Sequence, residues 1–271
     1  MIYSLESVTK LFPHRREHVQ ALNGVTLQVQ PGELLALLGQ SGAGKTTMFR
    51  LLNGTLRPTA GSVLFDGYDT ASLSGRELRA MRRRVGTIYQ QHNLVPSLTA
   101  LENTLCGALG RMSFLGTLRS LVQPAKTDLD YATHALELVG LADKRTARAD
   151  ELSGGQQQRL AAARVLMQSP DVILADEPTA SLDPELAETM TSLLIRLARD
   201  HRKTLIMAVH KVDLALRHFP RVLGLRDGRL SFDVPPSEVH RDLLDTLYAR
   251  NGRATEERDG DSLQYKLGCA R

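Results

Sequence analysis

The chain has 271 residues, of which 42% are hydrophobic, so it is long enough to bury one large core or two smaller ones. Its formal net charge is +4, but charges of both signs are mixed along the chain, so the basicity only weakly favours a nucleic-acid or membrane-surface partner. The two cysteines, Cys106 and Cys269, lie too far apart in sequence to predict a disulfide framework or a metal site, and they fit a reducing compartment. No apolar run reaches about 18 residues and the first residues lack the pattern of a secretory signal, so we expect no membrane-spanning segment.

The expected strands are of two kinds. In residues 2–7 and 25–29, polar and apolar side chains alternate in a way that predicts half-buried strands of an antiparallel sheet. Residues 34–38 are instead continuously apolar, as in a parallel strand that is buried on both faces. Three later runs, separated by helical patterns, have the same character: residues 172–175, 204–209 and 222–225. The sequence therefore predicts an α/β core.

The middle of the chain differs from both ends. It contains helix-like segments with caps, such as Thr99 followed three residues later by Glu102, and no clear strand, which predicts a helical insert. After Pro235 and Pro236 we expect a short helix, and then a polar tail. The expected organisation is a main domain over 1–240, with its core in 1–88 and 164–240 and the insert in 89–163, followed by a C-terminal helix and polar tail over 241–271.

Two further segments carry less information. The basic patch from Arg76 to Arg84 has no interleaved aromatic residues of the kind that stack on bases, which favours a solvated helix face over a nucleic-acid site. Residues 167–169, with the sequence Met-Gln-Ser, match no motif that predicts a role.

The first chemical motif follows the buried strand that ends at residue 38. The segment GQSGAGKTT fits the pattern G-x-x-x-x-G-K-[ST], which arises by accident in about one in a hundred chains of this length. A helical pattern follows, so backbone N–H groups would curl around phosphate oxygens at a helix N-terminus, which a glycine-rich turn without a ligand would not require. Lys45 would reach the β- and γ-phosphates, and Thr46 would ligate Mg²⁺. The predicted phosphate loop comprises Gly39, Gln40, Ser41, Gly42, Ala43, Gly44, Lys45, Thr46 and Thr47.

The second motif is a pair of carboxylates, Asp176 and Glu177, directly after the apolar run 172–175. This position is the edge of an α/β sheet at which ligands bind. We predict that Asp176 holds the Mg²⁺ shell and that Glu177 polarises the attacking water. Paired acids are also common at helix starts, so the pair is informative only together with the phosphate loop.

The third motif is Leu-Ser-Gly-Gly-Gln at residues 152–156. Ser153 followed three residues later by Gln156, before a helical run, is also an ordinary capping box. Both interpretations hold together, because a capped helix start with two glycines presents N–H donors and a positive dipole to an anion. The candidate second phosphate-binding segment is Ser153, Gly154, Gly155 and Gln156.

With these three motifs the chain resembles the ATP-binding subunits of ABC transporters from about residue 2 to residue 236. The resemblance implies a P-loop NTPase fold with a RecA-like α/β core, an antiparallel β subdomain and an α-helical insert. It also implies ATP and Mg²⁺ as cofactors and ATP hydrolysis as the activity. Two copies would dimerise head to tail, so that each ATP lies between the phosphate loop of one copy and the Leu-Ser-Gly-Gly-Gln segment of the other.

The same resemblance assigns further residues. Phe12 looks like the aromatic residue that stacks on adenine, although a residue of this type is also expected to pack in a core. Gln90 looks like the glutamine that senses Mg²⁺, water and the membrane partner. Gln91 is its possible alternative, but Gln90 directly follows the aromatic Tyr89 at the expected strand end.

Two more positions match the family's pattern. Asp183, in the segment Ser-Leu-Asp, resembles part of the intersubunit loop, although an aspartate before a proline is equally a helix cap. His210 follows the apolar run 204–209 and resembles the histidine that contacts the γ-phosphate. Its place at the carboxyl end of an expected strand favours a functional role over an incidental one.

Four segments are similar to ATP-binding subunits of phosphonate importers: residues 89–111, 111–121, 210–216 and 225–239. This resemblance implies separate membrane permease subunits that dock near Gln90 and the insert, a substrate-binding protein acting through them, no nucleic-acid partner, and a peripheral location at the cytoplasmic face of the inner membrane. The alternatives are another importer or an exporter, for amino acids or lipoprotein release, and a soluble ABC ATPase without a transport role. A substrate does not touch this subunit, so no residue here identifies it.

Overall fold

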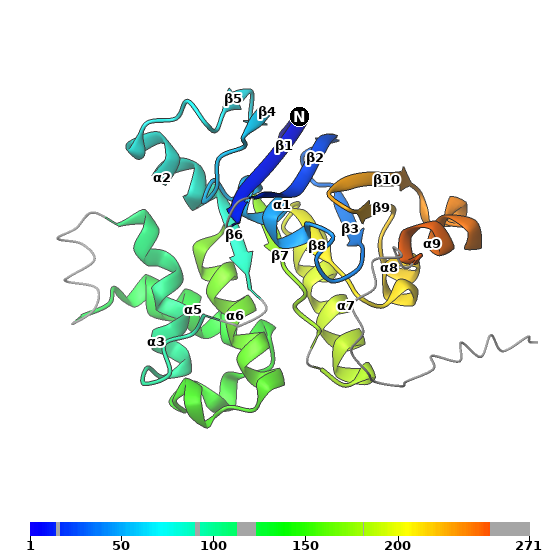
Figure 1. Ribbon diagram of the computed structural model, residues 1–271. Helices are drawn as coiled ribbons and strands as arrows, with labels where there is room; N and C mark the ends of the chain where they lie inside the picture. The colour runs from blue at the N-terminus through cyan, green and yellow to red at the C-terminus, as the bar shows by residue number, and fades with distance from the viewer. Residues whose placement is uncertain (15–16, 90–92, 113–122, 181, 250–271) are drawn as a thin grey trace, which may run out of the picture.

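The computed structural model describes residues 1–14, 17–89, 93–112, 123–180 and 182–249. Its centre is a sheet of six described strands in the order β10-β9-β3-β8-β7-β6 (Figure 1). Neighbours from β9 to β6 run parallel, and β10 pairs with β9 in an antiparallel hairpin. The strands are β3 (Leu34–Leu38), β6 (Val85–Ile88), β7 (Val172–Ala175), β8 (Thr204–Ala208), β9 (Arg221–Arg226) and β10 (Arg229–Val234).

A second, antiparallel sheet has the order β2-β1-β4-β5 among the described strands. The two predicted entry strands are confirmed as the starting part of β1 and the end of β2, and both are longer than their alternating patterns indicated. The bounds are β1 (Tyr3–His14), β2 (Glu17–Val29), β4 (Ala60–Phe65) and β5 (Tyr68–Asp69). The predicted α/β core and the antiparallel subdomain are therefore both present.

Helices cover both faces of the central sheet. The predicted caps are confirmed at Thr99, where α3 begins, and at Asp183, whose side chain accepts hydrogen bonds from two backbone N–H groups of α7. Residues 93–112 and 123–163 contain helices and turns but no strand. The helices are α1 (Lys45–Leu52), α2 (Gly75–Arg84), α3 (Ala100–Leu105), η1 (Cys106–Arg111), α5 (Lys126–Leu138), η2 (Ala142–Lys144), η3 (Ala149–Glu151), α6 (Gly154–Gln168), α7 (Pro184–Asp200), α8 (Val212–His218), η4 (Pro236–Glu238) and α9 (Arg241–Tyr248).

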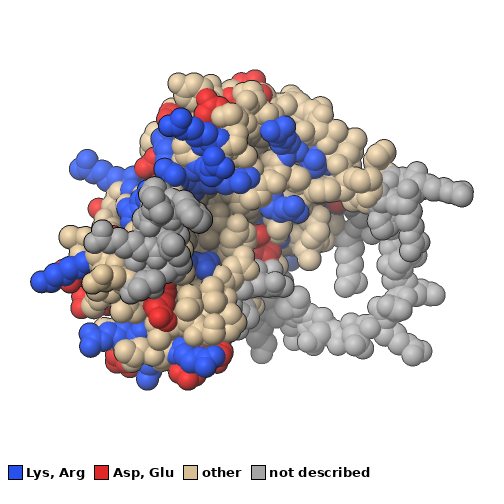
Figure 2. Space-filling view, turned by 90° about the vertical axis from the view of Figure 1, so that its left-hand side faces the viewer, with Lys and Arg blue, Asp and Glu red and all other residues tan. Residues whose placement is uncertain are grey.

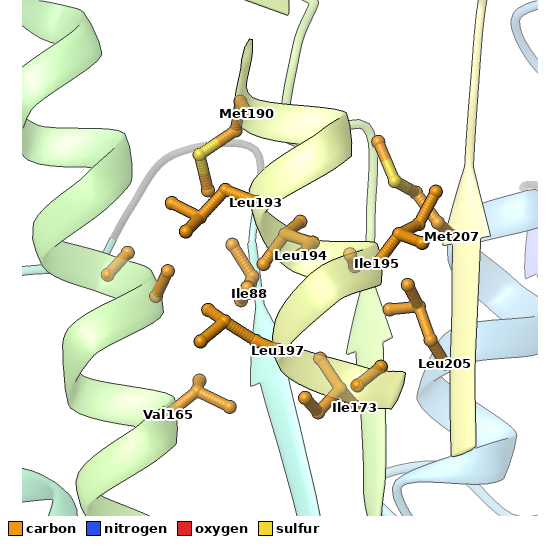
Figure 3. Packing of buried hydrophobic residues seen from close by; sticks show 14 of the residues in the cluster. Ile88, Val165, Ile173, Met190, Leu193, Leu194, Ile195, Leu197, Leu205 and Met207 are labelled. Atoms are coloured by element: carbon orange, nitrogen blue, oxygen red, sulfur yellow. The ribbon is translucent and has the colours of Figure 1, made fainter. Parts of the chain in front are cut away.

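The central sheet separates two hydrophobic cores because successive side chains of a strand point to opposite faces. On β3, Leu35 and Leu37 contact the core shared with α1 and the antiparallel sheet. Leu34, Ala36 and Leu38 contact the other core, which α6, α7 and α8 cover. Figure 3 shows part of this second core, in which Leu197 of α7 lies between Val165 of α6 and Ile173 of β7.

The end of the predicted insert, at residue 163, lies inside α6. One helix therefore belongs to both regions: its first turns extend from the insert, and its last turns pack on the central sheet. Gly86 of β6 lies so close to α6 that a Cβ atom there would be 2.7 Å from Val165. A small residue at this strand position thus permits the close packing of helix and sheet.

The basic patch is only partly a solvated helix face. Arg76, Arg79, Arg82 and Arg83 are exposed on α2, as predicted. Arg84 is half-buried, pairs with Asp171 at 2.6 Å and with Asp66 at 2.8 Å, and lies over the ring of Phe65. The last arginine of the patch therefore connects the two sheets, which the charge pattern alone does not indicate.

Among the described residues, no helix has the length and apolar character needed to cross a membrane.

Tyr3 connects the antiparallel sheet to α1, because its buried hydroxyl donates a 2.8 Å hydrogen bond to the carbonyl of Leu52. Burial also raises the pKa of Tyr3 far above its ordinary value, so the hydroxyl stays protonated. We expect Tyr3→Phe to lower the free energy of unfolding by about 1–3 kcal/mol, because a buried carbonyl loses its partner. Denaturant unfolding measures the change. The control is Tyr68→Phe, on a side chain that is 69% exposed, and equal losses in the two variants would contradict the assignment.

Candidate active site

The predicted phosphate loop lies between β3 and α1, at the carboxyl end of a fully buried strand. Gly42 and Gly44 have φ angles of 81° and 109°, in the left-handed region that favours glycine. At Gly44 there is also no room for a side chain, because a Cβ atom would lie 2.5 Å from the carbonyl oxygen of Ala21. The loop is thus a tight turn that ends at a helix N-terminus, where backbone N–H groups suit an anion.

Lys45, at the start of α1, is only 4% exposed although it carries a charge. Its ammonium donates to the carbonyl oxygens of Gly39 at 2.7 Å and Gln40 at 3.0 Å. The same group is 3.1 Å from Oε1 of Glu177. The loop and the predicted acid pair therefore meet at this lysine.

Asp176 and Glu177 follow β7, whose carboxyl end lies beside that of β8 in the same sheet. Asp176 is 7% exposed, and burial raises the pKa of its carboxyl, while a hydrogen bond with Thr46 acts in the opposite direction. Its Oδ1 atom is buried and has no hydrogen-bond partner among the described residues. A buried carboxylate oxygen without a partner, next to a threonine hydroxyl, is a donor set that suits a hard cation such as Mg²⁺.

His210 follows β8 and joins this group. Its Nε2 atom is 2.6 Å from Oε2 of Glu177, so the glutamate lies between the histidine and Lys45. Glu177 has a left-handed backbone with φ 51°, which is uncommon for a residue other than glycine. The three side chains come from α1, the end of β7 and the end of β8, and the contacts of Glu177 with the other two are not readable from the sequence spacing.

The remaining predicted residues lie outside this cluster. Phe12 is half-buried in β1, so it is not simply a core residue, and the ammonium of Lys10 lies 5.3 Å from its ring centroid. Asp183 is the N-cap of α7, with hydrogen bonds from the N–H groups of Glu185 and Leu186. Gln90, its alternative Gln91 and Ser181 fall outside the described residues.

The segment at residues 153–156 begins α6, and both halves of the predicted capping box are present. The Ser153 hydroxyl accepts from the N–H of Gln156, and the Gln156 side chain accepts from the N–H of Ser153 at 2.9 Å. Gly155 is buried against α7, where a Cβ atom would lie 2.3 Å from a methyl carbon of Leu186. No hydrogen bond or ion pair among the described residues joins this segment to the phosphate loop. The two candidate phosphate-binding segments thus begin different helices, α1 and α6.

A phosphate loop after a buried parallel strand, faced by two carboxylates and a histidine from neighbouring strand ends, defines the class of P-loop nucleotide-binding proteins. Comparison with known proteins specifies the class further. The family model described as ABC transporter matches residues 22–180 of this chain. The chain belongs to this family and has its ATP-hydrolysing fold.

Curated relatives and solved structures match over most of the chain. The phosphonates import ATP-binding protein PhnC of Pseudomonas fluorescens strain Pf0-1 is 44% identical over 88% of this chain and 89% of its own length. The protein of the same name from Alcaligenes faecalis is 46% identical over 84% of this chain and 82% of its own. A dimeric ATP-binding cassette in a post-hydrolysis state, bound to ADP and Pi, is 33% identical with a TM-score of 0.76, covering 87% of this chain and 99% of that one.

Lys45 is the residue whose loss has the clearest expected effect on nucleotide binding. We expect Lys45→Ala to weaken ATP binding by about 30-fold to several thousand-fold, to the point where it is lost at ordinary nucleotide concentrations, because truncating one partner of a buried charged contact costs about 2–5 kcal/mol. Titration with a fluorescent ATP analogue measures the affinity. The control is Lys144→Ala, on a lysine of η2 whose side chain is 44% exposed. Unchanged affinity in Lys45→Ala would show that the loop does not bind the phosphates.

Proposed function

We propose that the chain is the ATP-hydrolysing motor subunit of a phosphonate importer, and that a head-to-tail dimer couples ATP hydrolysis to separate permease subunits. The observation that carries the substrate class is the 44% identity over 88% of the chain to a phosphonates import ATP-binding protein. The observations that support the chemistry are the contacts of Lys45, Glu177 and His210. The substrate passes through the permeases and does not touch this subunit.

In the proposed reaction each residue of the site has one task. Residues 39–47 enclose the phosphates, with Lys45 on the β- and γ-phosphates, and Glu177 accepts a proton from the attacking water. His210 orients the glutamate and lies beside the γ-phosphate. Thr46, Asp176 and Gln90 would hold Mg²⁺, and the unpartnered Oδ1 atom of Asp176 supports this assignment. The ion would neutralise the charge that develops on the phosphate oxygens.

A second copy of the chain completes the proposed site. Ser153 and Gly154 are exposed and Gln156 is half-buried at the start of α6. The capping box uses the N–H groups of Ser153 and Gln156, so the donors for a nucleotide held by another copy would be the Ser153 hydroxyl, the Gly154 N–H and the Gln156 side-chain amide. Phe12 would stack on the adenine, and Asp183 would lie in the loop between the two copies. The dimeric, nucleotide-bound form of a 33% identical cassette supports this arrangement.

We assign the permease contact to a basic groove between α2, η1 and α6. The groove has a volume of about 460 Å³, and no aspartate or glutamate occurs among the described residues that line it. Figure 2 shows lysine and arginine side chains gathered in the upper half of this side of the molecule. A groove of this charge suits an acidic segment of a protein partner at the cytoplasmic face of the membrane. Its arginines are Arg79, Arg82, Arg83, Arg111 and Arg164.

Replacing the proposed catalytic base should trap the closed dimer. We expect Glu177→Gln to bind ATP without turning it over, so that the nucleotide keeps two copies together. Size-exclusion chromatography with ATP and Mg²⁺ should then show a dimer, whereas the same variant with ADP should elute as a monomer. Glu137→Gln, on an exposed side chain of α5, is the control and should stay a monomer while hydrolysing ATP. A persistent monomer of Glu177→Gln at saturating ATP would count against the two-site dimer.

Growth of the host tests the importer assignment. With a phosphonate as the only phosphorus source, we expect disruption of the gene to abolish growth, wild type to restore it, and Glu177→Gln to fail. Phosphate-fed cultures should grow equally well. Arg83→Glu should reduce growth while the purified variant keeps its ATP affinity, whereas Arg76→Glu, on the same helix but outside the groove lining, should behave as wild type. Equal growth of the disrupted and intact strains on phosphonate would refute the substrate class.

A further inference from the structure

The ammonium of Lys45 already has a full set of partners. Its three N–H groups match three oxygen atoms: the carbonyls of Gly39 and Gln40 and the carboxylate of Glu177, at 2.7, 3.0 and 3.1 Å. Lys45 is 4% exposed and the Glu177 side chain is 14% exposed, so water screens their attraction only weakly. A phosphate group that is to contact this lysine therefore has to displace an existing partner.

Glu177 is the partner that a phosphate would displace. The two carbonyls belong to the loop that carries the lysine, whereas Glu177 reaches the lysine from the end of a different strand. A carboxylate and a phosphate are both negative and repel each other at this distance. The two anions therefore compete for the same cation.

His210 keeps the glutamate in this position. Its Nε2 atom is 2.6 Å from Oε2, while the ammonium contacts Oε1, so both carboxylate oxygens are engaged. Oε1 is therefore held against the ammonium, where a phosphate of the nucleotide is proposed to lie. The contacts that cover Lys45 thus also hold the Glu177 carboxylate, which is assigned as the catalytic base, against Lys45 and His210.

We propose that in the nucleotide-free protein Glu177 covers Lys45 and competes with the phosphates of an incoming nucleotide. The proposal rests on the assignment of residues 39–47 as the nucleotide site. Phosphate binding turns the glutamate away from the lysine, and the same movement frees its Oε1 atom to face water. The base is therefore released only when a phosphate is in place.

The test compares ADP affinities of the full-length wild type, Glu177→Gln and Glu177→Asp by calorimetry. ADP is the probe because it lacks the γ-phosphate that closes the dimer, and gel filtration in ADP verifies that each sample is a monomer. Glu177→Gln removes the charge that competes with phosphate. Glu177→Asp keeps the charge but is one methylene shorter, so it cannot maintain contacts of 3.1 and 2.6 Å to both neighbours. We expect both variants to bind ADP about tenfold more tightly than wild type.

The control variant is Glu188→Gln. Glu188 also lies between a histidine and a cation, His218 and Arg217, but on α7 and α8, away from the phosphate loop. Its substitution should leave ADP affinity unchanged. Equal ADP affinities of wild type and both Glu177 variants would overturn the proposal. Tighter binding in Glu177→Gln alone would also overturn it, because the negative charge at residue 177 would then weaken ADP binding without any contact to Lys45. If none of the proteins binds ADP, the proposed function itself fails, and the role of Glu177 with it.

Discussion

The site depends on the register of three neighbouring parallel strands. β3 pairs with β8 through Leu37 and Ala208, and β8 pairs with β7 through Met207 and Ala175. The carboxyl ends of the strands therefore lie at one edge, and the loops that follow them meet there. All three strands are buried on both faces, so a slip by one residue would bury the wrong side chains against each core. The hydrophobic packing of the sheet thus fixes which polar groups face one another.

The helix α6 connects two distant features of the molecule. Its first residues form the capped segment proposed to contact a nucleotide on a second copy, and its last residues line the basic groove. The side chain of Gln168, near its end, lies within hydrogen-bond distance of the carbonyls of Arg82, Arg83 and Val85. A helix of 15 residues spans about 22 Å, so α6 joins these two places directly. A movement of the proposed nucleotide contact at one end would therefore reach the proposed permease contact at the other.

Much of this arrangement follows from local sequence patterns. The buried strands 34–38 and 172–175, the phosphate loop and three helix caps were predictable, because each depends on neighbouring residues. The strands β4, β5 and β10 are not predicted by the sequence, since they are short or lack a continuous apolar run, and β6 is expected only as a strand that ends near Tyr89. Gln168 matched no motif, because its role is to satisfy carbonyls of a segment more than 80 residues earlier. Long-range hydrogen bonds of this kind leave no periodic signal in the sequence.

The pair Asp176 and Glu177 shows how backbone geometry determines chemistry. In a continuous strand, adjacent side chains point to opposite faces of the sheet, so only one of the two could face the phosphate loop. The left-handed backbone of Glu177, with φ 51°, ends the alternation directly after Asp176. Asp176 then lies beside Thr46, while Glu177 contacts Lys45 and His210. Glycine would adopt this conformation without strain, but it carries no carboxylate, so the strain is the cost of placing an acid at this turn.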